Sequence, residues 1–290
     1  MINTIPNCKP AECLNQRIFK SQIYRLMKKT YHKLQLIAAI VLSVLMLSCT
    51  QQTAKDQQAV TSLSKEIKEI HKGILEGYLS EGEIPNSLKL VPPPPQEGSA
   101  AFKLDQEIAA KYVAMDNDTR KEQATKDAVL SFPEATKAFN IVLDIKISEE
   151  NTPNLYMILR RTLADAGLST YAAKNHYQRK RPFMLNNTPT CTPDEEEALR
   201  KDGSYPSGHT SIGWAWALIL SEVFPDQSDV ILERGKEFGI SRNVCNVHWH
   251  SDVVYGRMMG AATVAVLHAN PQFVIDLEAA KAEVKAINNN

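Results

Sequence analysis

Residues 206–224 read PSGHTSIGWAWALILSEVF, and this stretch has the composition of a buried helix. After the first four residues almost every position is apolar or small, as in a helix that packs on several sides. Ser207 has the side chain of a helix N-cap, and Gly208 allows a ligand to approach the backbone closely. The amides of such a first turn point at an anion, and the helix dipole favours its charge. An ordinary capped helix would carry the same Ser-Gly pair, so His209 is the residue that favours a binding site.

The remainder of the chain is also patterned for helices. Residues 253–268 are apolar and rich in small side chains, and Leu155, Ile158 and Leu163 recur at helical steps. Further helices are expected over 105–115, 119–130, 134–143 and 276–287, whereas no convincing run of alternating strands and no internal repeat is present. We therefore expect an all-α fold, with a single helical domain over residues 84–290.

A second histidine lies beside a carboxylate near the start of the segment 253–268. His248 and Asp252 are four residues apart, so on a helix they would share a face. A carboxylate that accepts a hydrogen bond from one ring nitrogen fixes the tautomer and leaves the other nitrogen free to attack. Arg242 lies just upstream. A hydrogen bond on a helix surface is the commoner explanation for a histidine four residues from an aspartate. The presence of the other motifs in the same chain argues against that explanation here. His250 lacks a clear third ligand, so no metal site is predicted.

Two further cations precede these motifs. Lys174 and Arg181 are seven residues apart, which predicts that one helix presents both on the same side and ends at Pro182. An arginine at that boundary can bind oxygens through two donors. Arg179 and Lys180 are expected on other faces of this helix. A basic helical stretch alone is more often a solvated surface.

The N-terminal part resembles an export signal. Met27-Lys28-Lys29 begins a basic stretch, an apolar run extends from Leu36 to Leu47, and Cys49 follows it. The run is short for a membrane span. We therefore interpret residues 1–48 as upstream residues and signal peptide, with Met27 as the native start. Cys49 is the expected lipidation site, and ordinary cleavage nearby is the alternative.

Residues 49–83 are interpreted as a lipoprotein tether and an amphipathic helix. Residues 50–58 are polar and rich in glutamine, and Val60, Leu63, Ile67, Ile70 and Ile74 then recur at steps of three and four. This helix would pack on the domain or on a second copy of the chain, which leaves a homo-oligomer open. Gly82 to Gly98 contains four consecutive prolines and is expected to be extended.

Cysteine content and charge bound the function. After export only Cys191 and Cys245 remain, and an isolated pair in an oxidising compartment predicts one disulfide. Two separate buried thiols are the alternative. The formal net charge is zero, so no overall field favours nucleic acid as a partner.

The motifs occur in an order that resembles a known family. Lys174-x6-Arg181-Pro182, Pro206-Ser207-Gly208-His209 and Ser241-Arg242-x5-His248-x3-Asp252 are similar to the signature of the phosphatidic acid phosphatase superfamily, to which the vanadium haloperoxidases are related. Residues 89–95, 181–183, 201–214 and 247–253 look like the class A bacterial non-specific acid phosphatases. The chain departs from that class at Asn243, Asn246 and His250, where an aliphatic residue, glycine, and glutamine or proline are expected.

The resemblance implies an exported, all-α, metal-independent acid phosphatase without a cofactor, in the periplasm and anchored by lipid to the outer membrane. Its substrates would be many small phosphomonoesters, its product inorganic phosphate, and transfer of phosphate to alcohols is left open. The implied catalytic residues are His248 as nucleophile, His209 as acid and base, and Asp252 as the group that orients His248. The implied phosphate-binding groups are Lys174, Arg181, Ser207, Gly208 and Arg242.

Three other functions fit parts of the pattern. A vanadate-dependent haloperoxidase would use the same pocket residues. A membrane-embedded lipid phosphatase would need several long apolar spans, which the chain lacks. A non-catalytic phosphate-binding lipoprotein would need only one of the two histidines. The sequence does not indicate whether Tyr205, Trp214 or Trp249 lines the pocket for the leaving group.

Overall fold

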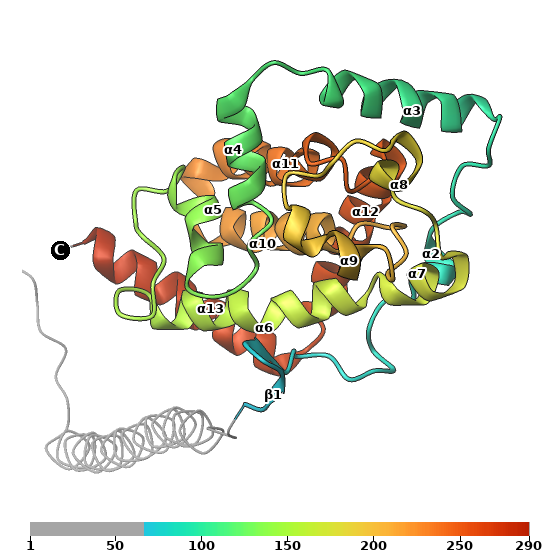
Figure 1. Cartoon of the computed structure of the whole chain (residues 1–290). Helices are drawn as coiled ribbons and strands as arrows, with labels where there is room; N and C mark the ends of the chain where they lie inside the picture. Colours follow the sequence, from blue (N-terminus) through green and yellow to red (C-terminus); the bar gives the residue numbers. More distant parts are fainter. Residues whose placement is uncertain (1–66, 290) are drawn as a thin grey trace, which may run out of the picture. The chain divides into compact units, whose positions relative to one another are not determined.

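Helix α10 (Gly208–Val223) lies at the centre of the fold, as its apolar sequence predicts. The computed structural model describes residues 67–289, and within them α10 packs against α6, α11 and α12 (Figure 1). Small residues permit this close approach. A Cβ at Gly256 of α12 would lie 2.6 Å from the carbonyl oxygen of Ser207, which places the start of α12 against the start of α10. The close contact brings the motifs of both helices together.

Helices make up almost all of the regular structure in the described part of the chain, so the all-α prediction is confirmed. The long helices are α3 (Ala100–Val113), α4 (Asp118–Lys126), α6 (Pro153–Leu168), α11 (Ser228–Val244), α12 (His250–Leu267) and α13 (Pro271–Asn288). The short ones are α2 (Ser87–Leu90), η1 (Glu134–Thr136), α5 (Lys137–Asn140), α7 (Tyr171–Tyr177), α8 (Pro182–Asn186), η2 (Pro193–Glu195), α9 (Glu196–Leu199) and η3 (Pro225–Gln227).

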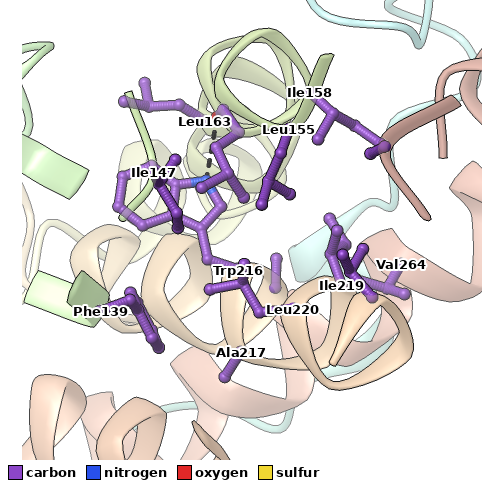
Figure 2. Close-up of a cluster of buried hydrophobic side chains, with 14 of the residues drawn as sticks. Phe139, Ile147, Leu155, Ile158, Leu163, Trp216, Ala217, Ile219, Leu220 and Val264 are labelled. Carbon is purple, nitrogen blue, oxygen red and sulfur yellow. Dashed lines mark hydrogen bonds between the residues drawn. The ribbon is translucent and has the colours of Figure 1, made fainter. Parts of the chain in front are cut away.

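The main hydrophobic core lies between α10 and the helices around it. Trp216 of α10 is buried among Phe139, Ile147 and Leu155 (Figure 2). Its indole nitrogen donates a 3.0 Å hydrogen bond to the carbonyl oxygen of Leu159 in α6. A buried indole needs such a partner, because an unpaired N–H would cost free energy. This bond and the surrounding packing fix α6 against α10.

The predicted amphipathic helix near residue 74 is wrong where the structure describes it. Residues 69–75 form a hairpin in which β1 (Glu69–His71) pairs antiparallel with β2 (Ile74–Leu75). The turn between the strands contains Gly73 at φ +80°, a conformation that glycine adopts without strain. The apolar spacing therefore reflects side chains of a hairpin that packs on α6, not one face of a helix.

The compact unit begins at Ile67, earlier than residue 84, where the sequence placed the start of the domain. The predicted signal peptide, Met27 start, Cys49 lipidation site and tether lie outside the described residues. Within residues 67–289, no single helix is both long and apolar enough to cross a membrane. Helices α12 and α13 meet that test only as a pair bent by 96°.

Candidate active site

The three distant motifs converge on one cavity. Lys174 in α7, Arg181 before α8, Gly208 and His209 at the start of α10, and His248 before α12 all line it. Nη1 of Arg181 lies 3.1 Å from Nε2 of His248, although the two residues are 67 positions apart in the chain. Ser207, Arg242 and Asp252 do not line the cavity themselves. Asp252 contacts His248 from behind, and the charge of Arg242 acts on both His209 and His248.

The tautomer of His248 follows from its neighbours. The Nδ1 atom lies 3.2 Å from Oδ2 of Asp252, and a carboxylate accepts, so Nδ1 carries the proton. Nε2 faces the guanidinium of Arg181, which can only donate, so Nε2 presents its lone pair. Burial lowers the pKa of His248 well below its ordinary value, and the charges of Arg181 and Lys174 lower it further. The ring is therefore a neutral imidazole with Nε2 available as a nucleophile.

Asp252 holds this arrangement from the first turn of α12. Its side chain is fully buried, and Oδ2 also accepts a 2.9 Å hydrogen bond from the backbone N–H of Trp249, the N-cap of that helix. His248 itself precedes α12, so the predicted contact exists, but it does not arise from two side chains on one helical face. It arises because Asp252 caps the helix start that the histidine adjoins.

The second histidine is oriented by a backbone carbonyl. Nε2 of His209 lies 3.0 Å from the carbonyl oxygen of Ala128, which can only accept, so Nε2 carries a proton and Nδ1 is left for proton transfer. Burial lowers the pKa of His209 well below its ordinary value, and the charge of Arg242 lowers it further. Arg242 therefore acts electrostatically on this ring.

Arg242 is a buried cation with no fixed counter-ion contact. Its side chain is 0% exposed, and none of its three nitrogens has a hydrogen-bond partner among residues 67–289. Burial lowers its pKa to about 10, so the group stays charged at neutral and acid pH. An unpaired guanidinium in the interior costs free energy that an oxyanion would recover. This is the strongest structural sign of an anion site.

The start of α10 completes the predicted phosphate-binding group, which is here called the cradle and consists of Lys174, Arg181, Ser207, Gly208 and Arg242. Ser207 is the N-cap, as predicted, and its Oγ accepts from the backbone N–H of Thr210 at 3.3 Å. Its hydroxyl also accepts from the side chain of Thr210 at 2.9 Å, which leaves the Ser207 proton free to donate. The first-turn amides of a helix have no partner within that helix. Gly208, which lines the cavity, supplies one of them.

Asp202 is a site residue that the sequence analysis missed. Its Oδ2 lies 2.9 Å from Nζ of Lys174 and 3.1 Å from Nη2 of Arg181, and its side chain is 36% exposed. Burial and the charge of Arg181 lower the pKa of Lys174 to about 8. The carboxylate thus pairs with two of the three cations in the absence of substrate. Asp202 falls within the stretch 201–214 that resembles the acid phosphatases, but the resemblance assigned it no role.

Arg179 was assigned to another face of a helix, and this prediction is wrong. Helix α7 ends at Tyr177, and its C-cap Gln178 has a left-handed conformation, so Arg179 and Arg181 follow in a non-helical segment. Lys174 and Arg181 therefore do not share a helix. Nη1 of Arg179 lies 2.6 Å from Oδ1 of Asp252, and its Nη2 lies 2.7 Å from Asp105 of α3. Arg179 thus holds the carboxylate that orients His248.

The segment before His248 is held by a cysteine pair and by two asparagines at which this chain differs from the class A acid phosphatases. Cys191 and Cys245 lie at disulfide distance, with Cα atoms 4.8 Å apart. Asn246 has φ +59°, a conformation open to asparagine and glycine, which explains why asparagine can stand where glycine was expected. Nδ2 of Asn243 donates a 2.9 Å hydrogen bond to the carbonyl of His248.

Among residues 67–289, no group of three or more His, Cys, Asp or Glu side chains is placed to hold a metal ion.

Comparison with known proteins agrees with this geometry. The family model described as "PAP2 superfamily" matches residues 155–275, which contain every residue of the cradle. A non-specific acid phosphatase of Providencia stuartii is 44% identical over 207 residues, which cover 71% of this chain and 84% of the relative. The chain belongs to the PAP2 superfamily.

Other relatives in the PAP2 superfamily carry similar names. A non-specific acid phosphatase of Salmonella typhimurium is 39% identical over 74% of this chain and 86% of its own length. An acid phosphatase of Zymomonas mobilis is 39% identical over 67% of this chain and 73% of its own length. The resemblance drawn from the motifs is therefore confirmed over most of the chain.

Proposed function

We propose that this protein is an exported acid phosphatase that hydrolyses a broad range of phosphomonoesters through a phosphohistidine intermediate. Its place among the non-specific acid phosphatases makes it a phosphatase. The single observation that supports the mechanism is the lone pair of His248 Nε2, which faces a buried cradle of cations. The same positioning and charge stabilisation account for most of the catalysis in phosphoryl transfer.

The first step forms a P–N bond and breaks the ester P–O bond. Nε2 of His248 attacks phosphorus, while Lys174, Arg181 and Arg242 stabilise the charge on the non-bridging oxygens. His209 gives its Nδ1 proton to the leaving alkoxide, which departs as an alcohol. The negative phosphate group offsets the cations around His209 and so favours its protonated form in the complex.

The second step cleaves the intermediate. Neutral His209 takes a proton from water, the water oxygen attacks phosphorus, and the P–N bond breaks to release inorganic phosphate. An alcohol in place of water would yield a new phosphomonoester, which is the proposed phosphotransferase activity. Asp252 stabilises the positive charge that His248 carries as the phosphohistidine.

Labelling tests the nucleophile. Rapid quenching of the wild-type protein in alkaline denaturant, after mixing with phosphate-labelled substrate, should trap a base-stable, acid-labile phosphoprotein. His248→Ala should form none, because His209, which lines the same cavity, acts in the proposal as the acid and not as the nucleophile. His209→Ala should still label with a p-nitrophenyl ester, whose leaving group needs little protonation. Burst labelling retained in His248→Ala would remove the nucleophile assignment.

Export and lipid attachment form a separate part of the proposal. They rest on the basic stretch, the apolar run and Cys49 in the sequence. Labelled fatty acid should be incorporated into the wild-type protein and not into Cys49→Ser, and the mature protein should fractionate with the periplasm or outer membrane. A cytoplasmic, unlabelled product would remove this part and leave the phosphatase untouched.

A further inference from the structure

The cavity of the active site continues beyond the phosphate cradle. Its volume is about 360 Å³. Clefts that hold whole small-molecule ligands begin at about 300 Å³, so this cavity falls within their range. Apart from the cradle, its lining is mainly aliphatic. The aliphatic residues are Ile70, Ile74, Leu130, Leu163, Ala164, Leu168, Leu199 and Ile212.

The N-terminal hairpin supplies part of this wall. Ile70 and His71 of β1 and Ile74 of β2 line the same cavity as His209 and His248. Tyr171 is the aromatic residue that lines it, whereas Tyr205, Trp214 and Trp249 do not. Tyr205 is fully buried and donates a 2.7 Å hydrogen bond to the carbonyl of Pro92, and the Trp249 indole donates to Lys180 at 2.8 Å. The leaving group therefore meets the hairpin and not those rings.

The hairpin is fixed to α6 by the segment that follows it. The carboxylate of Asp165 accepts hydrogen bonds from the backbone N–H groups of Tyr78 at 2.9 Å and Leu79 at 3.0 Å. Arg161 donates to the carbonyl of Gly77 at 2.9 Å, and its guanidinium lies 3.7 Å from the centre of the Tyr78 ring. A Cβ at Gly77 would collide with the Asp165 carboxylate, so only glycine permits this contact. The wall is thus built into the fold.

The chemistry of the wall restricts what it can bind. Among the residues that line the cavity, the polar groups outside the cradle and its Asp202 are His71 and the hydroxyl of Tyr171. A sugar or a second phosphate would leave several polar groups without partners there, at a cost of about 1–3 kcal/mol for each buried group. An apolar group would instead gain free energy as it leaves water.

We propose that Ile70 and Ile74 of the hairpin, with the facing side chains of α6, form a leaving-group site that selects phosphomonoesters of compact apolar alcohols, such as arylalkyl esters, over those of polyols. This inference rests on the proposed phosphatase activity and adds the preferred class of substrate. The hairpin is accordingly a specificity element, whereas the cradle binds any phosphoryl group.

Two primary alkyl esters test this inference, because their leaving groups have similar intrinsic reactivity. The wild-type protein should hydrolyse 2-phenylethyl phosphate with a kcat/KM at least about tenfold above that for glycerol 1-phosphate. Ile74→Ser and Ile70→Ser should each lower the value for 2-phenylethyl phosphate about fivefold, since each removes roughly half of the burial free energy of an isoleucine. The value for glycerol 1-phosphate and the Ki of inorganic phosphate should change less than about twofold.

Ile275→Ser is the matched control. Ile275 lies in α13 and is 40% exposed, close to the 42% of Ile70, but it does not line the cavity. It should leave both substrates unaffected. Equal kcat/KM values for the two esters, or an equal fall for both in the hairpin variants, would overturn the leaving-group site while the phosphatase stands. If the wild-type protein hydrolysed neither of the two esters, the proposed function itself would instead be overturned.

Discussion

Substitution of Arg179 should separate the stability of this protein from the orientation of its nucleophile. The Arg179 side chain is 7% exposed and joins two carboxylates, Asp105 at 1% and Asp252 at 0% exposure. Arg179→Met would leave both carboxylates buried without this partner. Removal of one member of a buried ion pair costs about 3–5 kcal/mol. For a domain of this size such a loss lowers the melting temperature by roughly 6–20 °C.

The effect on catalysis should be distinct from this loss. Asp252 would keep its contacts to His248 at 3.2 Å and to the Trp249 N–H at 2.9 Å, but Oδ1 would lose its ion pair. We expect kcat to fall roughly tenfold to a hundredfold, the range typical of groups that support a catalytic ligand from behind. The KM should change little, because Arg179 does not line the cavity. Arg179→Lys should restore part of kcat, since the charge remains.

Asp105→Asn provides the control within the same cluster. It weakens the contact of α3 but leaves the Arg179–Asp252 pair intact, so it should lower the melting temperature and leave kcat near the wild-type value. Steady-state kinetics well below each melting temperature, normalised to folded protein, measures both quantities. If Arg179→Met loses stability but keeps kcat within about twofold of wild type, Arg179 serves the fold alone and its positioning role is refuted.

Three further predictions concern charge and covalent structure. The kcat/KM should rise as pH falls below about 6.5, because protonated His209 is required and its pKa in the free protein is lowered. A pH–rate profile with a neutral or alkaline optimum would contradict this. Inorganic phosphate at a hundredfold excess over its Kd should stabilise the wild-type protein by about 2.7 kcal/mol. Arg242→Gln should gain almost no stability from the same phosphate concentration, and it should lose none without phosphate, because Arg242 has no hydrogen-bond partner to lose. Thermal melts with and without phosphate measure both effects. Loss of the Cys191–Cys245 link, which spans 54 positions, should lower the free energy of unfolding by about 4 kcal/mol in denaturant titrations, and an unchanged midpoint on reduction would argue against a structural disulfide.

The sequence sufficed for the parts of the fold that local rules govern. The apolar stretch that begins at Ser207 forms α10 with that serine as its N-cap, and the last helix lies where its composition placed it. The predictions failed where short segments depended on tertiary contacts. The spacing of Ile67, Ile70 and Ile74 fits a helix as well as a hairpin, and only the Gly73 turn and packing on α6 decide between them.

Most residues of the candidate site could be named from the sequence, because each carries chemistry that the reaction needs. Their supporting residues could not. Arg179 and Asp202 are ordinary charged residues in sequence, and their roles depend on which buried partner the fold brings to them. One signal was available: Pro182 disfavours helix just before it, and alternate residues of a non-helical, extended stretch point the same way. On that basis Arg179 would have been placed with Arg181 and not on another helical face.

The three cations of the cradle are not equivalent, and the difference explains how the site can be stable and still attract an anion. Lys174 and Arg181 share the carboxylate of Asp202, so a phosphate that approaches them must compete with a charge already present. Arg242 has no hydrogen-bond partner among the described residues, and only the more distant charges of Glu195 and Asp127 offset its own. Pairing two cations limits the cost of burying like charges together, whereas leaving the third unpaired retains a driving force for the substrate. We therefore expect Arg242 to provide the larger electrostatic share of phosphate binding and Asp202 to reduce the share of the other two.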